Sequence, residues 1–276
     1  MDSQVQTLMR SQVYYGRSTM TRRVWGWAAV LMLAVIAVYV LAVALRLPST
    51  RTPPSPPAAS AVPDEYQTQR ENMVINDIEE RGVLDPEVRR AMRTVPRHEF
   101  VLAEYANQAY ADHPLPIGYG QTISQPYIVA AMTELLRLKR EDQVLEVGTG
   151  SGYQAAVLAE LVDQVYGVEI IEELYSRAGE TLQRLGYKNV QLKHADGYYG
   201  WEEHAPYDAI IVTAAPDHIP QPLIKQLKEG GRLVIPVGPP GSYQTLWLVE
   251  KQGGKTVSRE VMGVVFVPLT GSHPGP

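Results

Sequence analysis

The strongest constraint on the fold is a stretch in which an apolar run leads directly into a glycine-rich turn and then into a helical pattern. This stretch is residues 144–153, VLEVGTGSGY, with glycines at 148, 150 and 152. The order strand, glycine turn, helix is typical of parallel sheets that bind ligands at the carboxyl ends of their strands. The spacing differs from the G-x-G-x-x-G of dinucleotide sites and favours another nucleoside. Taken alone, such glycines also serve simply to permit positive φ.

The surrounding sequence alternates between strand-like and helical patterns. Apolar runs predict strands at 143–147, 164–168, 190–192, 209–213 and 232–237, and helical stretches lie at 153–161, 174–185 and 221–227. This alternation predicts a three-layer α/β domain with a mostly parallel sheet. Two further runs, 245–250 and 257–267, flank Gly253-Gly254 and predict a C-terminal antiparallel hairpin.

Two helices are expected before the sheet. Met73, Ile75, Ile78 and Val83 are spaced to share one helical face, and Asp85-Pro86 is expected to open a second helix. The globular domain is therefore predicted to cover residues 66–276.

The N-terminal quarter has a different character. Residues 1–23 are basic, and Val24–Leu45 has 22 residues without a charge, which predicts a transmembrane helix or signal anchor over residues 24–46. A cleaved signal peptide is the alternative, with Ala42-Val43-Ala44 as its cleavage site. Residues 47–65 hold six prolines and are predicted to be an extended linker.

Composition excludes several classes of function. The chain has no cysteine, and its six histidines show no i, i+4 pair, so no metal site is expected. Residues 1–51 hold six arginines and one acidic residue, Asp2, so they carry a charge of +5. Because the whole chain has a net charge of −5, residues 52–276 carry −10, which argues against binding of nucleic acid. Gly150-Ser151-Gly152 lacks the G-x-S-x-G spacing of a hydrolase elbow.

Acidic residues follow the next two strands in chain order. Glu169 ends the second strand, where a carboxylate can accept hydrogen bonds from two ribose hydroxyls. Asp196-Gly197 follows the third strand, where a carboxylate can accept an adenine amino group beside an accessible backbone. A glycine turn, an acid and Asp-Gly at three successive strand ends together predict an adenosine site.

At this point the chain resembles class I S-adenosylmethionine methyltransferases, whose first motif is similar to residues 146–152. Further segments are similar to protein-L-isoaspartate O-methyltransferases over about residues 70–272: VPRHEF at 95–100, PLPIGYGQTISQP at 114–126, YDAIIV at 207–212, LKEGGRLVIP at 227–236 and FVPLTG at 266–271. Residues 1–65 lie outside this resemblance.

The resemblance implies roles for individual positions. The implied residues for the cofactor, S-adenosyl-L-methionine, are Glu146, Gly148, Thr149, Gly150, Gly152, Glu169, Asp196 and Gly197. Ser124 matches the serine that the family places at the substrate carboxylate, and the implied substrate-binding residues are Thr122, Ile123, Gln125 and Val267. An alternative role for Ser124 is to cap the helix that runs to Leu136. Tyr127 stands where many eukaryotic members have His.

The implied reaction is transfer of a methyl group to the free carboxylate of L-isoaspartyl residues in damaged proteins and peptides. Repair would then proceed through the methyl ester and a succinimide, by a catalytic domain expected to be monomeric. Two alternatives stay open: methylation of one aspartate in a dedicated peptide or partner, and a membrane-tethered cofactor sensor without turnover. The arginine bias predicts a catalytic domain outside the membrane, whereas the cytosolic source of the cofactor favours the cytoplasmic side.

Overall fold

The computed structural model describes residues 65–239 and 241–272, which belong to one compact unit, Pro63–Pro276. The predicted basic segment, the predicted membrane segment at 24–46 and residues 47–64 of the predicted linker lie outside the described residues. Among the helices that are described, none combines the length and apolar character needed to cross a bilayer.

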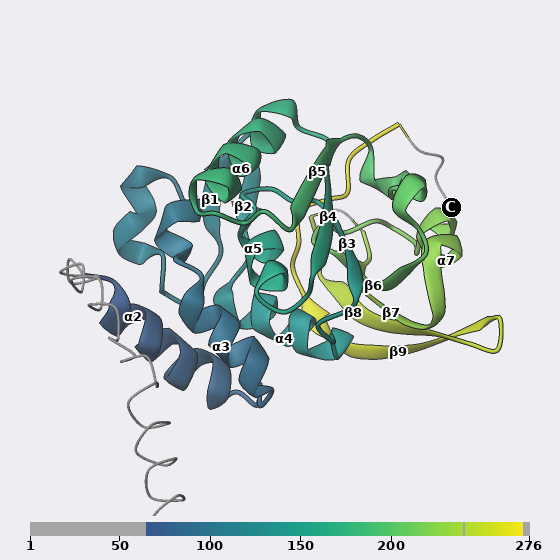
Figure 1. The fold of residues 1–276 in the computed structure, drawn as a ribbon, viewed down its shortest axis with the longest axis horizontal. Helices are drawn as coiled ribbons and strands as arrows, with labels where there is room; N and C mark the ends of the chain where they lie inside the picture. Colours follow the sequence, from purple (N-terminus) through teal and green to yellow (C-terminus); the bar gives the residue numbers. More distant parts are fainter. Residues whose placement is uncertain (1–64, 240, 273–276) are drawn as a thin grey trace, which may run out of the picture. The chain divides into compact units, whose positions relative to one another are not determined.

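A seven-stranded sheet with the order β5-β4-β3-β6-β7-β8-β9 forms the centre of this unit (Figure 1). β3 to β7 are parallel, whereas β8 and β9 are antiparallel. The strands are β3 Gln143–Val147, β4 Gln164–Glu169, β5 Val190–His194, β6 Tyr207–Val212, β7 Leu227–Val237, β8 Gln244–Gln252 and β9 Lys255–Val264. A separate hairpin joins β1 Leu115–Gly118 and β2 Gln121–Ile123.

Helices precede the sheet and connect its strands. They are α2 Gln67–Asn72, the π-helix η1 Met73–Glu79, α3 Pro86–Thr94, α4 Pro126–Leu136, α5 Tyr153–Ala159, α6 Glu172–Arg184 and α7 Gln221–Gln226. Short 3₁₀ turns are η2 Arg97–Phe100, η3 Ala103–Gln108, η4 Gly197–Tyr199 and η5 Glu202–His204.

Alternate side chains of the strands face two different hydrophobic clusters. Val144 and Ile211 pack on the side of α4, α5 and α6, whereas Leu145 and Val212 pack on the side of α7 and Trp201. Because both faces of the sheet are covered, the central strands β3, β4 and β6 are buried along almost their whole length instead of alternating between buried and exposed residues. The predicted α/β fold, with its mostly parallel sheet and antiparallel C-terminal strands, is confirmed.

The carboxyl end of β3 is the point at which the strand order reverses. β3 pairs with β4 on one side and with β6 on the other, so the connections after it leave in opposite directions. A crevice forms where the connections separate, and ligands of doubly wound sheets bind in this crevice. The glycine turn at 148–152 lies at this crevice.

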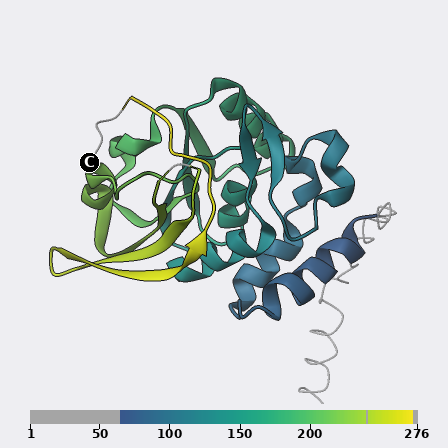
Figure 2. The same cartoon turned by 180° about the vertical axis from the view of Figure 1, so that it is seen from behind.

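Two details at the edges of the domain differ from the predicted pattern. Ile75 is 40% exposed and Val74 is buried, because Met73–Glu79 is a π-helix with i→i+5 bonds such as that from Glu80 N to Ile75 O. β9 ends at Val264, before the predicted end at residue 267. The following segment leaves the sheet edge and runs across the carboxyl ends of the strands (Figure 2).

The start of α3 offers a direct test of the sequence pattern. Asp85 caps the helix by accepting the N–H groups of Glu87 at 2.8 Å and Val88 at 3.3 Å. Asp85→Ala should therefore lower the free energy of unfolding by about 1 kcal/mol, whereas Asp85→Asn, which keeps a capping oxygen, should stay close to wild type. Urea unfolding of the three full-length proteins measures this. Equal losses for both variants would contradict a capping role.

Candidate active site

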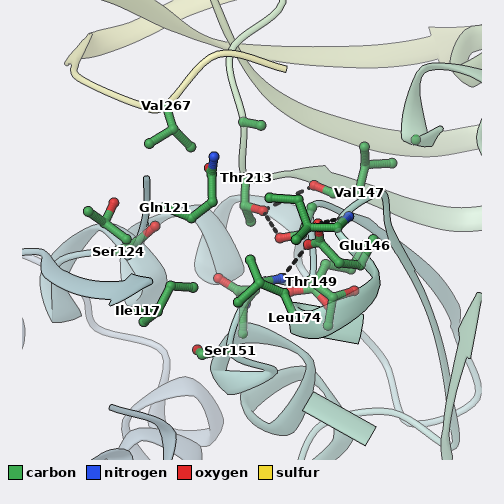
Figure 3. A pocket seen from close by; sticks show the side chains of 18 of the residues that line it. Ile117, Gln121, Ser124, Glu146, Val147, Thr149, Ser151, Leu174, Thr213 and Val267 are labelled. Carbon is green, nitrogen blue, oxygen red and sulfur yellow. Dashed lines mark hydrogen bonds between the residues drawn. The ribbon is translucent and has the colours of Figure 1, made fainter. Parts of the chain in front are cut away.

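A cavity of about 740 Å³ lies at the carboxyl ends of β3, β4 and β6 (Figure 3). Ten of the residues predicted for cofactor or substrate line it: Thr122, Ile123, Ser124, Glu146, Gly148, Thr149, Gly150, Glu169, Gly197 and Val267. The fold thus brings together residues that are up to 145 positions apart.

The glycine turn is shaped by close backbone contacts. Gly148 has φ +92°, and a Cβ atom at this position would lie 2.8 Å from Oγ1 of Thr213. The N–H of Gly148 donates to Val168 O at 2.8 Å, which fixes the start of the turn against β4. Substitution at Gly148 would strain the backbone and displace the end of β6.

Glu169 joins the glycine turn to the end of β4. Its carboxylate accepts the N–H of Gly150 at 2.7 Å through Oε2 and the N–H of Ile171 at 2.9 Å through Oε1. A carboxylate has about four acceptor positions, so two remain after these bonds. The side chain is 6% exposed and lines the cavity, so the remaining positions suit paired hydroxyls such as those of ribose.

Glu146 lies at the base of the cavity and is fully buried. Within the described part of the chain, neither of its carboxyl oxygens has a well-directed hydrogen bond, and neither does Oγ1 of Thr149. Burial raises the pKa of Glu146 to about 8, and the charge of Glu169 adds to this, whereas the nearby Thr149 hydroxyl opposes it in part. A buried carboxyl without partners is unfavourable unless a ligand compensates it.

The charge of the cavity selects among ligands. Glu146 and Glu169 line it, and the lining residues include no Lys, Arg or His in the part of the chain that the structure describes. Such a cavity opposes the phosphates of a dinucleotide and favours a cation. S-adenosylmethionine carries a sulfonium and an ammonium group, so the residues present fit this cofactor.

Three predicted residues lie outside the lining of this cavity. Gly152, with φ +88°, packs against Ala178 and Leu182, so its role is the close approach of α5 and α6. The Asp196 carboxylate accepts the N–H groups of Tyr198 and, from the C-terminal segment, Ser272. Gly197 does line the cavity, and a Cβ there would lie 2.5 Å from Val147 Cγ1.

Gln125 is the third predicted residue outside the lining of the first cavity. It lines a second cavity of about 920 Å³, which we call the substrate groove. Four residues line both the first cavity and the groove: Thr122, Ser124, Thr213 and Val267. They form a neck between the two. Figure 3 shows Ser124, Val267 and Thr213, three of these four residues.

Ser124 does not cap α4, contrary to the alternative role expected from the sequence. The cap position is Gln125 and makes no side-chain hydrogen bond, because the helix begins at Pro126. Pro126 has no N–H, and the N–H of Tyr127 donates to Asp112. The Ser124 hydroxyl has no hydrogen-bond partner within the described residues, so it is available to a ligand.

Arg97, for which the sequence predicted no role, holds the backbone of the neck residue Ser124. Its side chain is fully buried, and it donates from Nε to Ala109 O and from Nη2 to Ser124 O, both at 2.7 Å. The guanidinium carbon lies 4.8 Å from the centre of the Tyr153 ring. Burial lowers the pKa of Arg97. The only local signal was that Arg97 lies within the family-like segment VPRHEF at 95–100.

Fold and site together define a class I S-adenosylmethionine-dependent methyltransferase. The family model described as protein-L-isoaspartate(D-aspartate) O-methyltransferase matches residues 68–274. The chain belongs to this family, and the family, enzyme class and cofactor predicted from the sequence are confirmed. In the described residues, no cluster of three His, Asp or Glu side chains could hold a metal ion.

Similar proteins include curated relatives and solved structures. Protein-L-isoaspartate O-methyltransferase 2 of Syntrophobacter fumaroxidans is 56% identical and covers 78% of this chain and 92% of its own. The protein of the same name from a Polaromonas species is 62% identical, covering 70% and 92%. A solved protein-L-isoaspartate O-methyltransferase has a TM-score of 0.68 at 32% identity, covering 73% of this chain and 66% of that one.

A solved relative also carries a bound nucleoside. It is described as a protein-L-isoaspartate O-methyltransferase from Plasmodium falciparum in complex with S-adenosyl-L-homocysteine. Its TM-score is 0.63 at 28% identity, covering 74% of this chain and 98% of that one.

The buried Glu146 predicts a pH-dependent stability. In the native state its pKa is about 8, and its ordinary value is 4.5. Between these values the unfolded chain releases a proton that the native state retains, so stability without cofactor should fall as the pH rises from 5 to 8. In the variant Glu146→Gln, the free energy of unfolding should decrease less over this pH range, by roughly a few kcal/mol.

Urea unfolding at several pH values measures the effect in the full-length protein. Glu141→Gln, at an exposed position before β3, is the matched control and should retain the wild-type slope. S-adenosylmethionine should reduce the slope of the wild type because its positive charge favours the ionised carboxylate. Equal slopes for wild type and Glu146→Gln would contradict this account.

Proposed function

We propose that the substrate carboxylate is held at Ser124, in the neck between the cofactor cavity and the substrate groove. The reaction of the family is transfer of a methyl group from S-adenosylmethionine to the free carboxylate of L-isoaspartyl residues in damaged proteins. Repair then continues through the methyl ester and succinimide. The observation that carries the position of the substrate is that Ser124 lines both cavities while its hydroxyl remains available.

The nucleophile in this reaction requires no general base. An isoaspartyl carboxyl group has an ordinary pKa near ~4 and is therefore already an anion at neutral pH. Accordingly, the residues described in the neck are Thr122, Ser124, Thr213 and Val267, and none of these four side chains is basic. Their contribution is to align the carboxylate with the methyl group, since alignment lowers the barrier without proton transfer.

The apolar surroundings also favour the chemical step. The anionic carboxylate and the cationic methyl donor become neutral products, so charge decreases towards the transition state. Ile117, Val129 and Val267 line the cavity with aliphatic side chains. A dry, weakly polar site stabilises such a transition state relative to the separated charges.

Hydrogen bonding from Ser124 then provides orientation. Arg97 holds the backbone of Ser124 through its carbonyl oxygen, which leaves the hydroxyl to donate to a carboxylate oxygen. Thr213 is already engaged, because its hydroxyl lies 3.0 Å from Val147 O and 2.5 Å from Gly148 O. Of Ser124 and Thr213, Ser124 is thus the hydroxyl that remains available to the substrate.

A pair of peptides that differ only in an aspartyl or isoaspartyl linkage tests this proposal. We expect the full-length protein to form base-labile methyl ester on the isoaspartyl peptide alone. Ser124→Ala should lower kcat/KM roughly ten- to hundredfold, because a hydrogen bond to a charged group is lost, with cofactor affinity unchanged. Ser176→Ala, on the exposed side of α6, is the control and should match wild type.

The possible results separate the alternatives. Labelling of neither peptide, despite cofactor binding, would exclude general repair and favour a dedicated partner or a sensor. A Ser124→Ala protein with wild-type kcat/KM would remove Ser124 from the reaction and leave the family activity intact.

We further propose that residues 24–46 anchor this enzyme in a membrane. The proposal is supported by the 22 uncharged residues from Val24 to Leu45, which reach across a ~30 Å hydrocarbon core as a helix. The proline-rich residues 47–65 would then separate the catalytic domain from the bilayer. Four arginines precede the uncharged run, and Arg46 and Arg51 follow it, which favours a domain outside the cytoplasm.

The absence of cysteine allows sidedness to be measured directly. Lys255→Cys places one thiol at the exposed tip of the β8–β9 hairpin, and Ser3→Cys places one before the proposed anchor. In intact cells, an impermeant maleimide should label Cys at 255 and spare Cys at 3. The reverse pattern would place the domain with the cytosolic supply of cofactor, and loss of the N-terminal segment from the mature protein would exclude the anchor.

A further inference from the structure

The substrate groove exposes apolar surface. Tyr243 is 82% exposed and Val265 is 69% exposed, and both line the groove together with Met262 and Phe266. Tyr127 and Ile128 of α4 also line the groove. Exposed apolar surface next to a reaction site is unfavourable in water and typically marks a binding surface.

Two polar side chains of the groove, Arg81 and Gln125, are already engaged by Asp112. Asp112 accepts a hydrogen bond from Arg81 Nη1, from Gln125 Nε2 at 2.6 Å and from the N–H of Tyr127 at 2.9 Å. The Arg81 guanidinium also lies 3.5 Å from the centre of the Tyr127 ring, and Arg81 is the charged residue of the groove lining. Its charge is therefore countered by Asp112, and the groove presents mainly rings and aliphatic side chains.

The groove continues directly into the site of methyl transfer. Thr122, Ser124, Thr213 and Val267 belong to the lining of both cavities. A peptide whose isoaspartyl carboxylate is at Ser124 must therefore place a neighbouring part of its chain in the groove. This continuity identifies the occupant as the substrate's own flanking residues.

We infer that the substrate groove selects isoaspartyl sites with an apolar side chain immediately beside the damaged residue. The inference rests on the proposed position of the substrate carboxylate at Ser124. Apolar residues are buried in folded proteins and become available to the groove in unfolded chains. The enzyme would thereby favour damaged segments that have lost their native packing.

Peptides with a single isoaspartyl residue test the selectivity of the full-length protein. Leu or Asn, which are similar in size, is placed on either the N-terminal or the C-terminal side, with all other residues constant. At one of the two positions the Leu peptide should show a kcat/KM about tenfold higher, because an apolar side chain leaves water. Equal values for Leu and Asn at both positions would overturn the inference.

Variants of the groove link the preference to this surface. The double variant Val265→Ser and Tyr243→Ser should reduce the ratio between Leu and Asn peptides to less than about threefold, since the apolar contact is lost. Val257→Ser, which changes a 54% exposed valine of β9 outside the groove lining, is the matched control and should retain the wild-type ratio.

The results separate this inference from the proposed function. Methylation of all isoaspartyl peptides with no effect of the flanking residue would overturn the inference alone. Failure to methylate any isoaspartyl peptide would overturn the proposed function and the inference together. An unchanged ratio in the double variant would show that another surface reads the flanking residue, which also overturns the assignment to the groove.

Discussion

A buried guanidinium holds the two halves of the active site together. Arg97 connects the backbone of Ala109 with that of Ser124 and lies over the ring of Tyr153, the first residue of α5. The backbone at Ser124 is thereby fixed relative to α5, the helix that follows the glycine turn. Because Nη1 has no partner within the described residues and the group is excluded from water, this arrangement costs desolvation free energy. A purely structural connection between these segments would not require a charge.

The charges around the reaction site form a consistent pattern. The cofactor cavity contains the carboxyl groups of Glu146 and Glu169, and the Arg97 guanidinium donates to the carbonyl oxygen of Ser124. In the proposed binding mode, the cationic methyl donor lies beside these carboxyl groups, and the anionic substrate carboxylate lies at Ser124, whose backbone the Arg97 guanidinium holds.

Local patterns predicted those parts of the fold that local sequence determines. The strand at 143–147 and the start of α5 at Tyr153 were predicted at their observed positions, because apolar runs and glycines act over a few residues. The roles of Arg97 and Asp112 could not be predicted this way. Arg97 binds a carbonyl group 27 positions away, and no periodicity in the sequence reports such a contact.

The cofactor site shows the same division between local and distant determinants. Glu169 was predicted to face a nucleoside, and it lines the cavity with acceptor positions remaining. Asp196 was also placed there by its position after a strand, but its carboxylate accepts the N–H of Ser272, 76 residues later. Strand ends identify the rim of a site, whereas the final direction of each side chain depends on which segment crosses that rim.

The segment that crosses the rim also couples the two cavities. Residues 265–267 border the substrate groove, and residues 267–270 border the cofactor cavity. Ala215 holds this segment in place, since its N–H donates to Val267 O at 2.8 Å and its carbonyl oxygen accepts the N–H of Leu269 at 2.9 Å. A ligand that displaces one half of so short a segment must also move the other half. In the proposed binding mode, peptide and cofactor would therefore contact the two ends of one shared segment, and the affinity of each should depend on the other.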